Sequence, residues 1–196
     1  AEHPDLELLF TVDEETGLTG AGILDTSLIS GGTLISLDTE EDDTFIIGCA
    51  GGRNTLLSLD LSLQDAPRDH VCAEVEITGL AGGHSGLDIH EGRGNAIRLM
   101  ARFLKDVRIH LPFALVSISG GSKHNAIPRD AFSTILVERR HLGMLEELSA
   151  RARETYLEEL AGPDAGLGVK VREKETAACP HTIAPGDTDG ILDLLH

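Results

Sequence analysis

The sequence predicts an α/β (α+β) protein made of two unequal parts. In the second half, strand and helix patterns follow one another in the order β-α-β-β-α-β, which is typical of a ferredoxin-like unit. The first half contains short apolar runs separated by acidic and glycine-rich segments, as expected for strands at the edge of a larger α/β domain. With 196 residues, 41% of them hydrophobic, the chain is long enough to bury a real core.

The first half is expected to consist mainly of strands. Short apolar runs predict strands at residues 6–12, 34–37, 44–49 and 54–61. Only one weak helix is expected, near residues 22–30. Each of the first two runs is followed directly by an acidic residue, so we expect carboxylates at the ends of these two strands.

The second half has more regular patterns. Apolar residues alternate with polar ones over 71–78, the period of a half-buried strand. The remaining elements are predicted as helices over 93–107 and 142–160 and strands over 113–119, 132–137 and 169–172, with a linker from about 173 onward. Together they predict a four-stranded antiparallel sheet with two helices on one face.

A polar segment that contains Pro67 separates the two halves. We therefore predict a partial catalytic domain over residues 1–64 and a lid or dimerisation domain over residues 65–196, incomplete at its carboxyl end. Charge follows the same division, because residues 1–60 hold 13 of the 33 acids but only one base, Arg53. Such an asymmetry indicates two modules with different roles.

Composition excludes several classes of protein. The formal net charge of −17 argues against nucleic acid as a partner, because phosphate binding needs a positive surface. No apolar run approaches the ~20 residues that span a bilayer, so no membrane partner is expected. The three cysteines have no zinc-binding spacing, which favours buried thiols in a reducing compartment such as the cytoplasm.

Two acidic motifs follow predicted strands. The first is TVDEETG, in which Glu14 and Glu15 are adjacent, and the second is SLDTE, which contains Asp38. Neighbouring carboxylates can divide the work of metal-assisted hydrolysis, one binding a metal while the other accepts a proton. Taken singly, each motif is equally compatible with a solvated acidic turn.

Two further motifs lie in the second half. The segment LAGGHSG places His84 among three glycines, which permit close approach of the backbone to a ligand. It is neither a phosphate-binding loop nor a nucleophile elbow, because the required residues do not follow. The segment HNAIPR contains Asn125 in a turn between strands, where Asn and Pro are common without any function.

In this order, the four motifs resemble the dinuclear-zinc exopeptidases that include carnosinase, and most of all their aminoacyl-histidine dipeptidase branch. The resemblance is dense over residues 6–140 and thin afterwards. It rests on the segments TVDEETGLTGA, ISLDTEE, GCAGGR, GLAGGHSGLDIHEGRGNAIRLMARFL and GGSKHNAIPRDAF.

The resemblance implies a role for each candidate residue. Glu14 matches the general base of the family, while Glu15 and Asp38 match ligands of the two zinc ions. His84 matches a lid histidine that stabilises the oxyanion from the partner subunit, and Asn125 matches a lid residue that contacts substrate. The implied function is hydrolysis of dipeptides, of the Xaa-His type or broader, by a homodimer. Each active site of the full-length enzyme would hold two zinc ions, for which cobalt or manganese can substitute.

Other parts of the family's pattern are missing from this sequence. An upstream His-x-Asp motif, a bridging Asp and a histidine near the carboxyl terminus have no match, and His3 does not fit the first of these. We therefore expect the chain to be an internal fragment that is inactive alone. The alternative is a non-catalytic ferredoxin-like module that mediates dimerisation, although such a module would have no reason to keep Glu14, Glu15 and Asp38.

Overall fold

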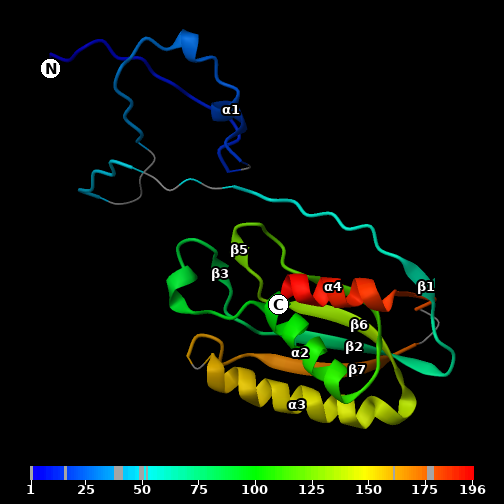
Figure 1. Cartoon of the computed structure of the whole chain (residues 1–196). Helices are drawn as coiled ribbons and strands as arrows, with labels where there is room; N and C mark the ends of the chain where they lie inside the picture. The colour runs from blue at the N-terminus through cyan, green and yellow to red at the C-terminus, as the bar shows by residue number, and fades with distance from the viewer. Residues whose placement is uncertain are drawn as a thin grey trace. The chain divides into compact units, whose positions relative to one another are not determined.

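The structure is a computed structural model that describes residues 2–15, 17–37, 42–48, 51, 53–160, 162–175 and 179–196. It divides into two compact units, Ala1–Gly52 and Arg53–His196, and each is described here by itself (Figure 1). The predicted domain division between residues 64 and 65 falls inside the second unit and stays a prediction.

The second unit is built on a four-stranded sheet with the strand order β4-β6-β2-β7. Every neighbouring pair in it is antiparallel. The strands are β2 (His70–Thr78), β4 (Ala114–Gly120), β6 (Ala131–Glu138) and β7 (Gly168–Lys174). With helices between the first and second and between the third and fourth strands, this is the β-α-β-β-α-β order that the sequence predicts.

Two long helices, α2 (Ala96–His110) and α3 (Leu142–Glu159), follow β2 and β6 in the chain. Helix α2 begins after Asn95, whose side chain accepts hydrogen bonds from the backbone N–H groups of Ile97 and Arg98. Its buried residues recur at helical spacing and pack on the inward face of the sheet. None of the helices in the described part of the chain is long and apolar enough to cross a membrane.

The hydrophobic core lies between the helices and one face of the sheet. Alternate residues of β2 point into it, because successive side chains of a strand face opposite sides. Fully buried core side chains include Ile77, Met100, Phe103, Leu104, Leu115, Ile135 and Leu145. The predicted helices and strands of this half are confirmed, each within a few residues of its expected ends.

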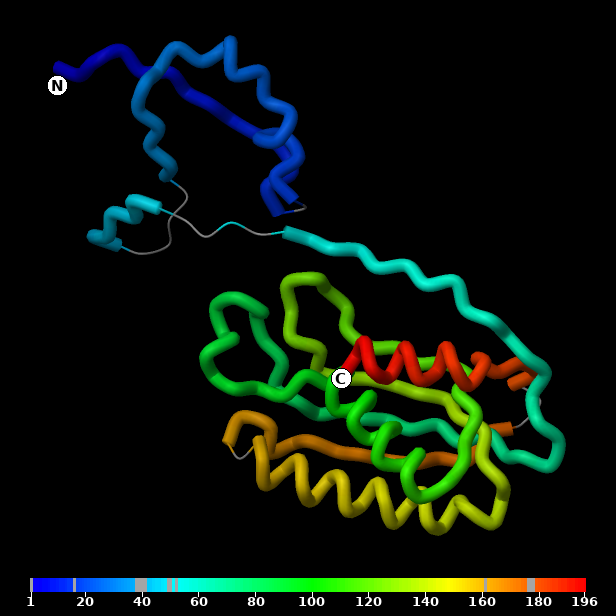
Figure 2. Tube along the Cα trace, in the orientation of Figure 1, coloured from blue at the N-terminus to red at the C-terminus, as the bar shows by residue number. Residues whose placement is uncertain are grey.

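The expectation of a linker from residue 173 onward is wrong. Strand β7 continues to Lys174, and the chain then forms β8 (His181–Ile183) and α4 (Pro185–Leu195). Ile191 and Leu192 of α4 are buried in the same core. The helix itself, drawn in red in Figure 2, contacts α2 and β4. Sequence reasoning missed α4 because it is short and begins with the breakers Pro185 and Gly186, yet proline is well tolerated in the first turn of a helix.

Two further strand pairs complete the second unit. Strand β1 (Leu63–Asp65) pairs with β8, and the backbone of Ser62 is hydrogen-bonded to Ala184 and to the Asp187 carboxylate. Strand β3 (Gly83–His84) pairs with β5 (Ala126–Ile127). The short 3-10 helices of this unit are η2 (Ile89–Glu91) and η3 (Arg139–His141).

The first unit differs from the sequence prediction. Its described residues form only helix α1 (Thr19–Gly22) and a 3-10 turn, η1 (Thr26–Leu28). The strands expected at 6–12, 34–37 and 44–49 are absent from its described part, although residue 49 lies outside it, and the strand expected at 54–61 in the second unit is also absent. Their apolar side chains are mostly exposed. The described residues of these runs also pair with no other strand, and a strand requires such hydrogen-bonded neighbours.

Candidate functional site

His84 and Asn125 come from motifs 41 residues apart, and the structure brings them together. Strands β3 and β5 form a two-stranded ribbon in which His84 lies opposite Ala126. Beside that pair, the backbone N–H of Ser85 donates a hydrogen bond to the carbonyl of Asn125 at 2.8 Å. Two of the five predicted site residues therefore share one small structural element.

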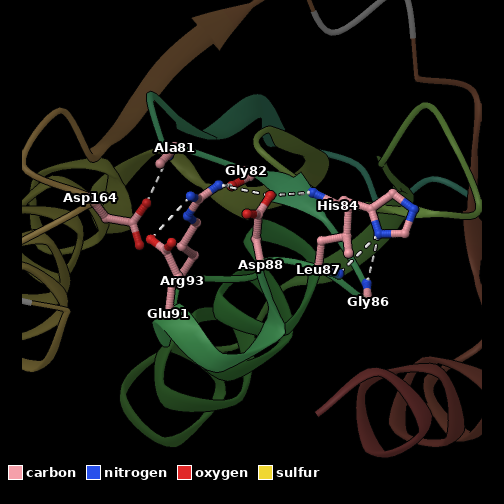
Figure 3. A network of polar contacts seen from close by, with 9 residues as sticks. All are labelled: Ala81, Gly82, His84, Gly86, Leu87, Asp88, Glu91, Arg93 and Asp164. Atoms are coloured by element: carbon pink, nitrogen blue, oxygen red, sulfur yellow. Dashed lines mark hydrogen bonds and ion pairs between the residues drawn. The ribbon is translucent and has the colours of Figure 1, made fainter. Parts of the chain in front are cut away.

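The orientation of the His84 ring is fixed by its own turn. Its Nδ1 atom accepts hydrogen bonds from the backbone N–H groups of Gly86, at 3.0 Å, and Leu87, at 3.1 Å (Figure 3). Since both partners are obligatory donors, Nδ1 acts as the acceptor, and the ring proton is placed on Nε2. The exposed side chain of His84 thus offers a hydrogen-bond donor at Nε2.

The His84 turn is held in place by Asp88 and Arg93. The Asp88 carboxylate accepts from the backbone N–H of His84 at 2.7 Å and forms an ion pair with Arg93 at 3.2 Å. Arg93 also donates to the carbonyl of Gly82 at 2.6 Å and pairs with Glu91 (Figure 3). One guanidinium therefore connects the glycine-rich segment before His84 to the acidic turn after it.

Two glycines of this segment are required by close packing. Gly82 and Gly83 have positive φ angles of 65° and 138°, which side chains rarely adopt. A Cβ atom on Gly83 would lie 2.2 Å from Arg93 Nη1 and 2.5 Å from the Asp88 carboxylate, and one on Gly82 would lie 2.2 Å from Arg129 Cγ. The glycines thus allow the backbone to approach the groups that position His84.

A buried carboxylate anchors the same segment to the core. Asp164 is 0% exposed, and its two oxygens accept from the backbone N–H groups of Ala81 at 2.7 Å and Gly94 at 2.6 Å. Arg129 adds a hydrogen bond to the carbonyl of Leu80. The loop that carries His84 is therefore fixed on both sides, and its geometry is set before any ligand binds.

Two open grooves lie along residues 120–128, a segment that includes β5. One, of about 510 Å³, is lined by residues that include Gly83, Gly120, Pro128, Arg129 and Phe132. The other, of about 670 Å³, is lined by Ser85, Asn95, Arg98, Lys123 and His124 among others. Positive side chains in the second groove favour an anionic group such as a carboxylate.

The predicted acidic residues lie in the first unit. Glu14 and Glu15 are exposed in a turn organised by backbone hydrogen bonds from Gly17 to Glu14 and from Gly20 to Val12. Asp38 lies outside the described residues. Elsewhere in this unit the Glu7 carboxylate accepts hydrogen bonds from the Ser30 hydroxyl and from the Gly31 and Ser30 amides, and these bonds lower its pKa.

These carboxylates do not by themselves make a metal centre. Among the described residues, no group of three or more His, Cys, Asp or Glu side chains is arranged to hold a metal ion. Two carboxylates in a solvated turn are a weak donor set for zinc, which takes four ligands that commonly include histidine or cysteine. The described residues of this chain therefore do not fit the dinuclear site that the resemblance implies.

Comparison with known proteins accounts for the fold of the second unit. The family model of the peptidase dimerisation domain, M20_dimer, matches residues 75–163. This match covers less than half of the chain. The matched segment contains His84, Asn125, Asp88 and Arg93, whereas Glu14, Glu15 and Asp38 lie outside it.

Relatives with curated names or solved structures cover more of the chain. It is 37% identical to the cytosol non-specific dipeptidase of Escherichia coli (strain K12) over 167 residues, which are 85% of this chain and 34% of that protein. The crystal structure of aminoacylhistidine dipeptidase from Vibrio alginolyticus matches 94% of this chain and 37% of its own, with a TM-score of 0.74 and 29% identity. The chain thus spans about one third of the length of these relatives.

Sequence reasoning missed the residues that hold His84 in place. Asp88 and Arg93 stand in the same GHSGLDIHEGR segment as His84, so their proximity in the chain was an available signal. Asp164 gave no such signal, because it lies 70 residues after Gly94 and follows a helix end. Only the three-dimensional fold shows that this carboxylate caps the glycine-rich loop.

Proposed function

We propose that this chain is part of a dipeptidase, and that it contributes the lid histidine and part of the catalytic carboxylate set. The observation that carries the proposal is the β3–β5 ribbon, which brings His84 close to Asn125 within the segment that matches the peptidase dimerisation domain. The 37% identity to a named dipeptidase supports the substrate class. Because the chain spans about one third of such relatives, the activity is proposed for a protein that also carries the remaining length.

The proposed chemistry is hydrolysis of a dipeptide bond, of the Xaa-His type or broader. His84 would donate from Nε2 to the oxyanion that forms as water attacks the carbonyl carbon, and Asn125 would contact the substrate. Glu14 would accept the proton of the attacking water. The groove with Arg98 and Lys123 supports a substrate that carries a carboxylate.

Metal dependence and assembly belong to the same proposal. We propose Glu15 and Asp38 as ligands of two zinc ions, with cobalt or manganese as substitutes, and the remaining ligands would come from residues beyond those described. The dimerisation domain supports a homodimer in which His84 serves the partner's site. The named cytosol relative supports a cytoplasmic location.

The first test uses the protein expressed with the sequence that flanks this chain in its gene. The intact mass of the native product is measured first, since 20.9 kDa is the mass of this chain alone. Glu14→Gln should then abolish turnover of an Xaa-His dipeptide while the bound metal and the fold stay near normal. Glu2→Gln, also an exposed glutamate of the first unit, is the control. Unchanged turnover in Glu14→Gln would refute the assignment.

The second test isolates the lid histidine. His84→Ala should lower kcat by about 10²–10³, the usual cost of one oxyanion donor, with little change in thermal stability. His90→Ala is the matched control, because His90 is an exposed histidine of the same segment. If the two variants lose activity equally, His84 has no special part in the reaction.

A second candidate function is a non-catalytic dimerisation module. Two observations favour it: the β-α-β-β-α-β unit is complete, and the described residues hold no cluster of metal ligands. The mass of the native product, together with its dimerisation and its activity, distinguishes the two proposals. A native product near 20.9 kDa that dimerises in sedimentation and shows no peptide hydrolysis would support the module, whereas a product more than twice that mass would support the dipeptidase.

A further inference from the structure

Two cysteines that are far apart in the sequence meet on the second face of the sheet. Cys72 of β2 is 0% exposed and Cys179, just before β8, is 4% exposed. They form a small apolar cluster with Leu136, separate from the main core, and Ala66, Ala114 and Val116 pack against it. Because neighbouring residues of β2 face the helices, Cys72 points to the opposite side of the sheet.

The two thiols are in direct contact. Their Sγ atoms lie 2.7 Å apart, across a separation of 107 residues in the chain. A disulfide bond has an S–S length of ~2.05 Å, so only a small movement of the side chains separates this contact from bonding distance. The sequence spacing gave no sign of the pair, because the contact depends on β8 returning to the sheet.

The contact joins the segment before β8 to the central strand β2. Pro180, next to Cys179, accepts a hydrogen bond from the backbone of Ala66, and β8 then pairs with β1. Cys72 stands in a central strand, between β6 and β7. A covalent bond here would tie the β1–β8 ribbon to the middle of the sheet.

We propose that Cys72 and Cys179 form a reversible disulfide by exchange with a small-molecule disulfide of the glutathione type. One cysteine, as its thiolate, attacks the small disulfide, forms a mixed disulfide and releases one small thiol. The second cysteine loses its proton and attacks the protein sulfur of the mixed disulfide, which releases the second small thiol. The two cysteines are oxidised by two electrons in total, and the small disulfide is reduced to two thiols.

The environment makes this exchange slow in the folded protein and faster at high pH. Burial, followed by the contact with Cys179, raises the pKa of Cys72 to about 12. The reactive thiolate is therefore scarce at neutral pH. Cys179 is the more accessible of the two, so the first attack is expected there. This site is independent of the proposed peptidase activity.

The test equilibrates the full chain in glutathione buffers from fully reduced to fully oxidised, then alkylates free thiols in denaturant. The oxidised chain should keep one reactive thiol, that of Cys49, and peptide mapping should show Cys72 linked to Cys179. In the oxidising buffer, a Cys49→Ala variant should show no free thiol, because both of its remaining cysteines are in the disulfide. The oxidised form should also unfold at a higher urea concentration, because the bond closes a long loop.

Three outcomes would overturn the proposal: three reactive thiols in the oxidising buffer, a cross-link that includes Cys49, or only mixed disulfides with glutathione. The wild-type mapping requires no variant, so the proposal can still be tested if Cys49→Ala or Cys179→Ala fails to fold. As a further check, Cys179→Ala should abolish the difference in urea midpoint between oxidising and reducing conditions.

Discussion

Large apolar side chains are buried in the core of the second unit, whereas those in the described part of the first unit are mostly exposed. In the second unit, large residues such as Phe103 and Met100 are 0% exposed between the sheet and its helices. In the first unit, Phe10 is 87% exposed and Phe45 is 94% exposed. The same residue type is therefore buried in one unit and solvated in the other.

This difference shows what an apolar run requires in order to become a strand. Strand β2 has β6 and β7 as hydrogen-bonded neighbours, and both follow within the same unit. The apolar run 6–12 has no such neighbour among the described residues of its unit. A run of strand-forming residues is thus necessary for a strand, but pairing of its backbone groups decides the outcome.

The largest expected difference between the units is in amide hydrogen exchange. Amides of β2 and β6 should exchange only through global unfolding, because they lie in the centre of the sheet. Amides of residues 6–12 should exchange orders of magnitude faster, since no backbone group among the described residues pairs with them. Exchange followed by mass spectrometry on the intact chain measures both. Comparable protection of the two segments would mean that the first unit has an ordered core of its own.

A matched pair of phenylalanines provides the second test. Phe103→Ala should lower the free energy of unfolding by about 3–5 kcal/mol, because it leaves a cavity in the close-packed core. Phe10→Ala should change it by less than about 0.5 kcal/mol, as is usual at exposed sites. Urea unfolding of the two variants measures the difference. A large loss in Phe10→Ala would show that this side chain packs against the protein in solution.

The second unit could be predicted well because its signals are local. The alternation over 71–78 and the apolar stripe of 93–107 each reflect burial on one face of one element. Helix α4 could not be predicted in the same way, because its place in the core depends on packing against α2 and β4. In the first unit, the apolar runs predicted strands whose partners the described residues do not supply.

In the candidate site, too, the sequence predicts some features and the structure alone shows others. Sequence motifs identified His84 and Asn125, and the structure brings them together through β3 and β5. Their pairing could not be derived from spacing, since a four-residue ribbon has almost no pattern of its own. The roles of Glu14, Glu15 and Asp38 stay predictions, because they depend on groups that the described residues do not contain.

Asp164 tests how firmly the core of the second unit holds the His84 loop. Asp164→Ala should lower the free energy of unfolding by about 2–3 kcal/mol, because the N–H groups of Ala81 and Gly94 lose their acceptor. Asp65→Ala is the control, since Asp65 is a solvated aspartate that should give no measurable change. Hydrogen exchange of residues 80–94 should also rise in Asp164→Ala. Unchanged exchange there would show that Arg93 and Arg129 alone fix the loop.

The smallest expected effect belongs to an ion pair on the surface between α2 and α3. Glu159 receives two hydrogen bonds from Arg102, and these lower the pKa of the carboxyl below its ordinary value of 4.5. Because the folded-state pKa is the lower one, the pair stabilises the protein above pH 4.5, and this contribution is lost as pH falls through the folded value.

Both side chains of this pair are more than one third exposed, so solvent screens the interaction. Glu159→Gln should therefore cost less than about 1 kcal/mol at neutral pH and nothing at low pH, where the wild-type carboxyl is already protonated. The neighbouring exposed residue provides the control variant, Glu158→Gln. Urea midpoints measured from pH 7 down to pH 3 should converge for Glu159→Gln and wild type. A difference in midpoint that stays constant over this range would show that the loss comes from packing and not from charge.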